Sequence, residues 1–236
     1  MYTTLDMETQ RVSAIALQHP SATAIFTRYN IDFCCGGKQS LKEACEKAGI
    51  SVDTVVNELY QNEPSAIPGT IRFDTWDISL LTDFIVQHHH QYVKRNIPEL
   101  HELLAKVCSV HGDRHPYLYS IKQTFSDLAN ELLQHMHKEE IILFPEAKRL
   151  FAGRTEPVFN VNAPLAVMED EHEYAGNLIK SIRKLTNTYS PPADACPTFK
   201  VTYRRLQEFD QDLMQHIHLE NNVLFEKLRI KTNTTF

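Results

Sequence analysis

The longest regular pattern in the chain begins near residue 75, where apolar residues recur in steps of three and four. This spacing is typical of helices that bury one face against their neighbours. It predicts four long helices, at about 76–109, 117–150, 164–188 and 197–228. No segment has the alternation of a convincing β-strand. The predicted fold is therefore all-α, with an up-and-down four-helix bundle over residues 75–230.

Shorter helical patterns fill residues 1–62, which we interpret as a separate N-terminal helical domain. Ser21 is positioned to cap a helix over residues 22–29, and residues 51–60 have the pattern of another helix. Ser40 and Glu43 have the spacing of a capping box, for a helix that ends near residue 49. Residues 63–74 contain two prolines and a glycine, which predicts a linker between the two domains.

The second and fourth helices of the predicted bundle repeat one another. Residues 133–139 and 214–220 both contain the motif His-x-His-x-Glu, and each copy is followed by Leu-Phe. In each copy a histidine and a glutamate are four residues apart, as His135 with Glu139 and His216 with Glu220. Residues at this spacing share one face of a helix, so each pair can contribute to one site.

The first and third helices each add one histidine at a matching distance. His90 lies 45 residues before His135, and His172 lies 44 residues before His216. Both His90 and His172 fall on the apolar stripe of their helices. A charged glutamate on such a stripe is costly to bury unless it is paired or bound to metal. We therefore predict one dinuclear metal site with six ligands: His90, His135, Glu139, His172, His216 and Glu220.

Neighbouring histidines are excluded from this ligand set by the helical period. His88 and His89 lie off the apolar stripe of the first helix. His137 and His218 follow the ligand histidines by two residues, which is about 200° around a helix. We therefore expect His137 and His218 on the outer face of the bundle.

The chemistry of the ligands indicates the metal. Four imidazoles and two carboxylates, without a thiolate, favour iron or manganese over a closed zinc site. The predicted cofactor is two non-haem iron ions, bridged by the carboxylates and by an oxide or hydroxide. Open coordination positions would admit NO, O2 or peroxide. Glu131 and Glu171 are close enough in sequence to orient a ligand, although a solvated glutamate is an equal alternative for each.

Composition limits the partners of this protein. The 236 residues include 24 Lys and Arg against 30 Asp and Glu, and no basic stripe is present, so we expect no nucleic-acid partner. The first 20 residues have only a short apolar run preceded by acidic residues, so we do not expect them to be a signal peptide. No apolar run approaches the roughly 20 residues that a membrane helix needs. We therefore expect a cytoplasmic protein without a membrane partner. In that compartment its five cysteines would be thiols.

Two adjacent cysteines, Cys34 and Cys35, are followed by Gly36 and Gly37. Adjacent cysteines cannot easily chelate one ion in relaxed geometry. We expect an exposed redox or iron-delivery thiol pair on a flexible turn. The alternative is that one of the two packs in the core of the N-terminal domain.

The motifs together resemble the RIC family, the bacterial iron–sulfur cluster repair proteins of the ScdA/YtfE type. Residues 29–38, Tyr-Asn-Ile-Asp-Phe-Cys-Cys-Gly-Gly-Lys, are similar to the cysteine-motif domain of that family. Residues 135–140, 168–172 and 216–225 are similar to its hemerythrin-like domain. The His-x-x-x-Glu order resembles hemerythrins rather than ferritin-like proteins, which use Glu-x-x-His.

The resemblance implies a protein that restores iron–sulfur clusters damaged by nitrosative or oxidative stress, by supplying iron to damaged or apo iron–sulfur proteins. It also implies a homodimer, the same six ligands, and a functional role for Cys34 and Cys35. A metal donor is favoured over a turnover enzyme. An NO-reducing di-iron enzyme and an O2 or NO sensor stay open as alternatives. True oxygen-carrying hemerythrins have five histidines where four are assigned here, which argues against simple O2 carriage.

Overall fold

The computed structural model describes residues 7–19, 21–62, 71–153 and 162–233. Over these residues the chain is helical, and its only β-type pairing is an isolated bridge between Arg11 and Ser40. The predicted all-α class is confirmed. Part of the predicted linker, residues 63–70, lies outside the described residues, so the domain boundaries stay a prediction.

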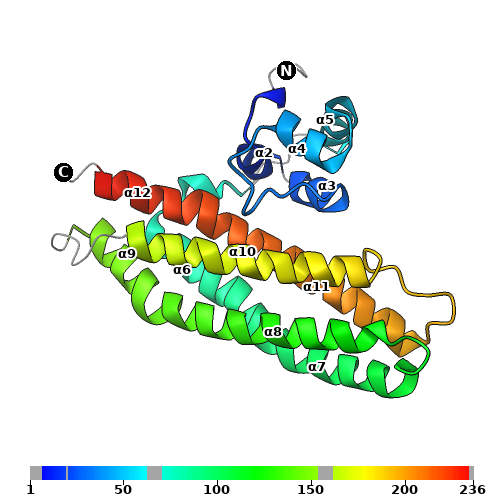
Figure 1. Cartoon of the computed structure of the whole chain (residues 1–236). Helices are drawn as coiled ribbons and strands as arrows, with labels where there is room; N and C mark the ends of the chain where they lie inside the picture. The colour runs from blue at the N-terminus through cyan, green and yellow to red at the C-terminus, as the bar shows by residue number, and fades with distance from the viewer. Residues whose placement is uncertain (1–6, 20, 63–70, 154–161, 234–236) are drawn as a thin grey trace.

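Four long helices lie side by side as an up-and-down bundle (Figure 1). The most extensive packing is between α8 and α10, and α7 packs to an equal extent on α8 and on α11. Three of the four helices are interrupted by a π-helical segment. In chain order the bundle consists of α6 (Ile78–Phe84), η2 (Ile85–His90) and α7 (Gln91–His111); α8 (Tyr117–Lys138), η3 (Glu139–Leu143) and α9 (Phe144–Phe151); α10 (Asn162–Leu185); and α11 (Pro197–Leu219), η4 (Glu220–Leu224) and α12 (Phe225–Asn233).

The π segments are a finding that the helical period did not predict. Each one borders a predicted ligand: η2 ends at His90, η3 begins at Glu139 and η4 begins at Glu220. A π turn accommodates one extra residue, so it rotates the faces of the helix on either side of it. In η2 this rotation brings both His89 and His90 inward. The prediction that His89 lies off the buried face is therefore wrong, since its side chain is 2% exposed.

The described part of the N-terminal domain includes four short helices that gather over the middle of the bundle (Figure 1). The capping box is confirmed: Ser40 accepts from the Glu43 backbone N–H, and Glu43 accepts from that of Ser40. Gly49 ends this helix at φ 69°, in the left-handed region that glycine adopts readily. Ser21 accepts no capping hydrogen bond, so that predicted cap is wrong. The helices are α2 (Val12–Gln18), α3 (Ala22–Arg28), α4 (Leu41–Ala48) and α5 (Val52–Gln61), with a short 3-10 turn, η1 (Phe73–Thr75), before the bundle.

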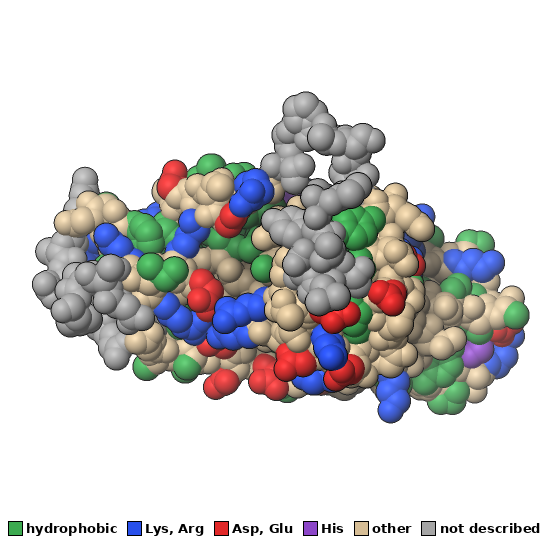
Figure 2. All heavy atoms as spheres, turned by 90° about the horizontal axis from the view of Figure 1, so that it is seen from above, with side chains coloured by type: hydrophobic (Ala, Val, Ile, Leu, Met, Phe, Trp, Pro, Cys, Tyr) green, Lys and Arg blue, Asp and Glu red, His purple; other side chains and the backbone are tan. Residues whose placement is uncertain are grey.

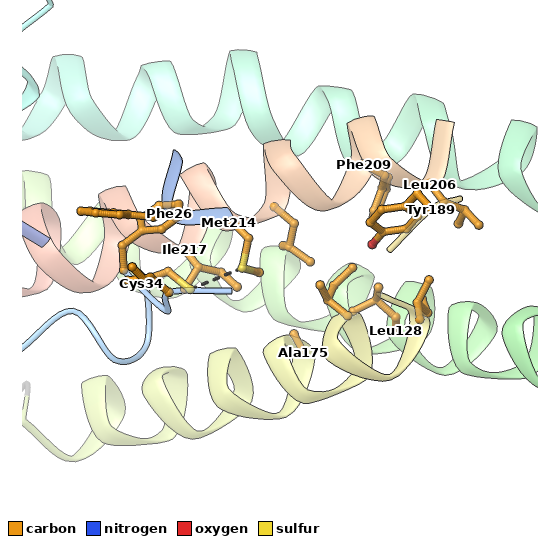
Figure 3. Close-up of a cluster of buried hydrophobic side chains, with 14 of the residues drawn as sticks. Phe26, Cys34, Leu128, Ala175, Tyr189, Leu206, Phe209, Met214 and Ile217 are labelled. Atoms are coloured by element: carbon orange, nitrogen blue, oxygen red, sulfur yellow. Dashed lines mark hydrogen bonds between the residues drawn. The ribbon is translucent and has the colours of Figure 1, made fainter. Parts of the chain in front are cut away.

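Two apolar clusters fill the molecule. The larger cluster joins the N-terminal domain to the bundle, and in Figure 3 Phe26 and Cys34 lie beside Met214 and Ile217 of α11. The smaller cluster lies at the other end of the bundle, where α6, α9 and α12 meet, and includes Phe225. Along each bundle helix the predicted ligands fall between these two clusters, which keeps water away from the polar layer.

Two further observations concern the charges on the surface and the apolar character of the helices. In Figure 2, Lys and Arg side chains alternate with Asp and Glu on the visible face and do not form a continuous basic stripe. Among the described residues, no helix has the length and apolar character needed to cross a membrane.

Candidate metal centre

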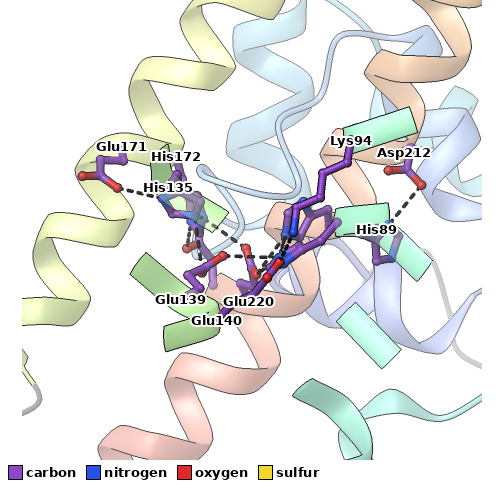
Figure 4. Close-up of polar contacts among 12 residues, drawn as sticks. His89, Lys94, His135, Glu139, Glu140, Glu171, His172, Asp212 and Glu220 are labelled. Atoms are coloured by element: carbon purple, nitrogen blue, oxygen red, sulfur yellow. Dashed lines mark hydrogen bonds and ion pairs between the residues drawn. The ribbon is translucent and has the colours of Figure 1, made fainter. Parts of the chain in front are cut away.

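All six predicted ligands converge on one buried layer of the bundle, and none is more than 2% exposed. The four imidazole rings point their Nε2 atoms inward as two pairs. His90 Nε2 lies 3.1 Å from His216 Nε2, and His135 Nε2 lies 2.8 Å from His172 Nε2. Figure 4 shows His135 and His172 together beside Glu139 and Glu220. Each pair joins one histidine from each half of the sequence repeat.

Each glutamate spans both histidine pairs. The two oxygens of Glu139 lie 3.3 Å from His135 Nε2 and 3.4 Å from His90 Nε2. The two oxygens of Glu220 lie 2.9 Å from His216 Nε2 and 3.1 Å from His172 Nε2. The six residues therefore form two overlapping groups of four that share both carboxylates.

The buried charges of this layer fit metal cations. Both oxygens of Glu139 and one of Glu220 are buried without a hydrogen-bond donor. Burial alone would lower the pKa of His90 and His135, but the adjacent carboxylates raise it to about 10 in both. Burial opposes ionisation of the glutamates too, yet the surrounding histidines hold the pKa of Glu139 and Glu220 below its usual value. The two buried carboxylates therefore need positive charge beside them. Divalent cations would supply it.

A second layer of side chains supports the outward Nδ1 atoms of three of these histidines. With Nε2 facing inward, Nδ1 carries the hydrogen and donates it. His135 donates to Glu171 at 2.7 Å, so the predicted supporting role of Glu171 agrees with its position. The other candidate, Glu131, makes no hydrogen bond or ion pair with any described ligand. The hydrogen bond from His135, with that from Lys138, lowers the pKa of Glu171 to about 2.

Two supporting residues escaped the sequence analysis. His90 Nδ1 donates to Glu140 at 2.8 Å, and His172 Nδ1 donates to Asn221 at 2.8 Å. Glu140 directly follows Glu139, and Asn221 directly follows Glu220. The repeat therefore carried a signal for both residues, because each directly follows a predicted bridging glutamate.

The two histidines assigned to the outer face differ in the structure. His137 is exposed, but the prediction for His218 is wrong, because its side chain is 0% exposed. Its Nδ1 lies 3.2 Å from the Phe33 carbonyl oxygen, and its ring packs edge-on against the Phe33 ring at 5.4 Å. The outer face of α11 is covered here by the N-terminal domain, which a period within one helix cannot reveal.

The segment 32–37, here called the cysteine loop, is held closely against the bundle. Asp32 Oδ1 accepts the backbone N–H groups of Cys35 and Gly36, both at 3.0 Å, and Lys180 of α10 donates to Asp32 at 2.9 Å. A Cβ added to Gly37 would lie 2.7 Å from the Phe33 carbonyl oxygen. The glycine therefore permits close packing, and the prediction of an open, flexible turn is wrong.

The two thiols of the cysteine loop are not equivalent. Cys34 is 2% exposed, with its Sγ 3.5 Å from Met214 Sδ, so the expectation of an exposed pair fails for this residue. Its hydrogen bond to Cys35 and its burial raise the pKa of the Cys34 thiol well above the usual value. Cys35 is partly exposed, and its Sγ lies 3.6 Å from the carbonyl oxygen of His172. It lines a cavity of about 130 Å³, together with Lys38, Glu169, Asp170, Glu173, Asn221 and Asn222.

Comparison with known proteins agrees with this two-part organisation. Residues 82–228 match the hemerythrin HHE cation binding domain, and residues 8–63 match the ScdA_N family, which is described as a domain of unknown function. A protein from Yersinia pseudotuberculosis and one from Yersinia pestis, both named iron-sulfur cluster repair protein YtfE, are each 36% identical over 228 residues. These matches cover 94% of this chain and 98% of each relative.

The chain belongs to the YtfE family of iron–sulfur cluster repair proteins. The resemblance stated from the motifs is thereby confirmed. Family membership also indicates what the buried layer binds. The cation-binding domain of the family and the histidine–glutamate cluster coincide, so the bundle is an iron-binding domain of the hemerythrin type.

Proposed function

We propose that this protein restores damaged iron–sulfur clusters by supplying iron from a two-iron centre. The six ligands of that centre would be the four inward histidines with Glu139 and Glu220. The observation that carries the proposal is the position of the two glutamates, each within 3.4 Å of a histidine from both pairs. Two carboxylates so arranged match what is needed to bridge two cations. The repair role in this proposal is inferred from the names of the similar proteins.

The donor set is suited to iron that is held and then released. Each proposed ion would have two imidazole nitrogens and one oxygen from each glutamate. Thiolates, which would favour zinc or a cluster, are absent from the described ligand layer. Four protein ligands leave room for a small molecule such as NO, O2 or peroxide, or for an incoming ligand from an acceptor protein. We infer that apo or damaged iron–sulfur proteins are the acceptors.

Cys34 and Cys35 would act in transfer and not in holding the iron. Their sulfur atoms are not among the six proposed ligands. Cys35 meets a cavity with three acidic side chains, Glu169, Asp170 and Glu173, which would attract a cation. We expect a Cys34→Ala/Cys35→Ala variant to keep its iron and to lose much of its repair activity. Loss of iron on purification would instead assign the cysteines to the metal site.

The experiment that tests the proposal follows iron through one sample. The iron-loaded protein is mixed anaerobically with an apo iron–sulfur protein and inorganic sulfide, and both iron loss and cluster reconstitution are measured. We expect the iron gained by the acceptor to equal the iron lost by the donor. NO consumption is assayed on the same preparation. Sustained NO turnover with full retention of iron would support the alternative of an NO-reducing enzyme and would contradict donation.

A further inference from the structure

The four histidines of the metal layer are not supported equally on their outward sides. Three Nδ1 atoms donate to acceptors at 2.7–2.8 Å, from His90, His135 and His172. The Nδ1 of His216 is buried and has no hydrogen-bond partner. In the pair His135 with His172, both Nδ1 atoms therefore have an acceptor. In the pair His90 with His216, only the Nδ1 of His90 has one.

The internal repeat shows where the missing acceptor belongs. His135 donates to Glu171, which directly precedes the ligand His172. The repeat-related position, directly before the ligand His90, is His89. At the position whose side chain would accept from His216, an imidazole therefore replaces the carboxylate.

His89 is turned so that it cannot accept this hydrogen bond. Its ring stacks parallel to that of His216, with the centroids 5.4 Å apart and the planes at 5°. Its Nδ1 lies 3.0 Å from Asp212 Oδ1, which holds the ring in this orientation (Figure 4). The stack fills the space beside His216 without supplying a polar partner.

The rest of the layer is balanced, which isolates the difference at His216. Both histidine pairs share the same two glutamates. Each pair also has one histidine supported by a carboxylate that a lysine neutralises, Glu140 with Lys94 and Glu171 with Lys138. What remains is the contrast between His172, which donates to Asn221, and His216, which donates to nothing.

Outer hydrogen bonds orient a ligand imidazole and strengthen its bond to metal, and their loss typically costs roughly 10–100-fold in metal affinity or activity. We propose that the two metal positions are unequal, and that the ion between His90 and His216 is held more weakly and leaves first. Asn221 acts as a positioning residue for the stable ion. This inference rests on the proposed two-metal centre, and it identifies the ion that is donated.

The stable position is also the one next to the N-terminal domain. Asn221 accepts from His172 and donates to the carbonyl oxygen of Cys34 at 3.5 Å. Cys35 contacts the backbone of His172 as well. The cysteine loop therefore braces the half of the site that keeps its ion, while the opposite half rests on the stack with His89.

The first test needs no acceptor protein and no activity measurement. The fully loaded protein is treated with an iron chelator, and release is followed over time. We expect two phases of about one ion each, separated by roughly 10-fold or more in rate. Crystals of the half-depleted protein should then show anomalous scattering of iron between His135 and His172. A single phase, or remaining iron between His90 and His216, would overturn the proposal.

Two neighbouring asparagines provide a matched pair of variants. Asn221→Ala should speed the slow phase roughly 10-fold or more, because His172 then loses its acceptor. Asn222→Ala is the control: Asn222 donates to the Cys34 carbonyl oxygen at 3.0 Å but contacts no ligand side chain, so both phases should persist. Asn221→Asp restores an acceptor and should slow the phase again. Equal release from the two alanine variants would refute the role of Asn221, whatever the outcome of the repair assay.

Discussion

His218 is the residue for which the position predicted from the sequence and the position in the structure differ most clearly, and substitution can distinguish them. The helical period assigns it to the outer face, like its repeat counterpart His137. In the structure it is fully buried between α11 and the cysteine loop, with its Nδ1 3.2 Å from the Phe33 carbonyl oxygen. His218→Ala should therefore destabilise the contact between the domains, whereas His137→Ala should not.

The magnitude follows from what the substitution removes. Truncating a large buried ring to alanine costs about 3–5 kcal/mol for Phe or Trp, and the smaller imidazole should cost about 2–3. The lost hydrogen bond adds about 1 kcal/mol. We expect His218→Ala to lower the free energy of unfolding by about 3 kcal/mol. The exposed His137 should contribute less than about 0.5 kcal/mol.

The assay is urea unfolding of the two metal-free variants beside the unaltered protein, with the reactivity of Cys34 towards a thiol reagent as a local probe. His218→Ala should also expose Cys34, because Phe33 then loses its partner. Iron content should be unchanged in both variants, since neither residue is a proposed ligand. Equal stability of the two variants would refute the buried, interdomain role of His218.

The same residue makes a prediction about pH. Burial lowers the pKa of His218 to about 4, although its hydrogen bond to Phe33 works in the opposite direction. The unfolded chain, with a pKa of about 6.5, therefore binds more protons between these values, so stability falls as the pH falls from about 6.5 to about 4. At about 1.4 kcal/mol per pH unit, the loss approaches about 3 kcal/mol. In His218→Ala this part of the slope should vanish, and parallel stability profiles would contradict the assignment.

The remaining predictions concern the metal ligands, the cysteine loop and the capping box. Glu139→Ala should remove most of the iron, because a carboxylate proposed to contact both ions is lost, while Glu131→Ala should keep it; the measured iron content per chain decides. Asp32→Ala should free the cysteine loop and increase thiol reactivity, since two backbone N–H groups lose their acceptor; reactivity no greater than in the unaltered protein would contradict this. Ser40→Ala should cost about 1 kcal/mol in unfolding free energy. Ser21→Ala should cost almost nothing, because Ser21 caps no helix.

The bundle and the six side chains that meet in its buried layer were accessible from the sequence because both depend on short-range periodicity. Four long helices followed from apolar spacing, and the structure has them at nearly the predicted bounds. The repeat of His-x-x-x-Glu indicated two ligands on one helical face without any knowledge of packing. The capping box at Ser40 is equally local, since both of its hydrogen bonds lie within four residues.

The wrong or missing predictions have two causes: local departures from a regular helix, and contacts made by other helices. A constant period of 3.6 residues cannot register the π turns, and the inward rotation of His89 went unnoticed for that reason. Ser21 has the residue type of a cap but accepts no backbone N–H. Glu140 is polar and half-exposed, and only the approach of His90 from another helix reveals its role.

The sequence by itself determined which residue types could bind metal and that they would occur twice. Only the tertiary structure decided how they pair. The repeat relates His90 to His172 and His135 to His216, but the Nε2 atoms meet as His90 with His216 and His135 with His172. The packing of α7 on α11 and of α8 on α10 permits this pairing, so each imidazole pair combines one histidine from each half of the repeat. The tertiary structure also decides that His216 Nδ1 has no acceptor. A hydrogen bond needs an acceptor at the right place, and repeat-related positions can hold different residues.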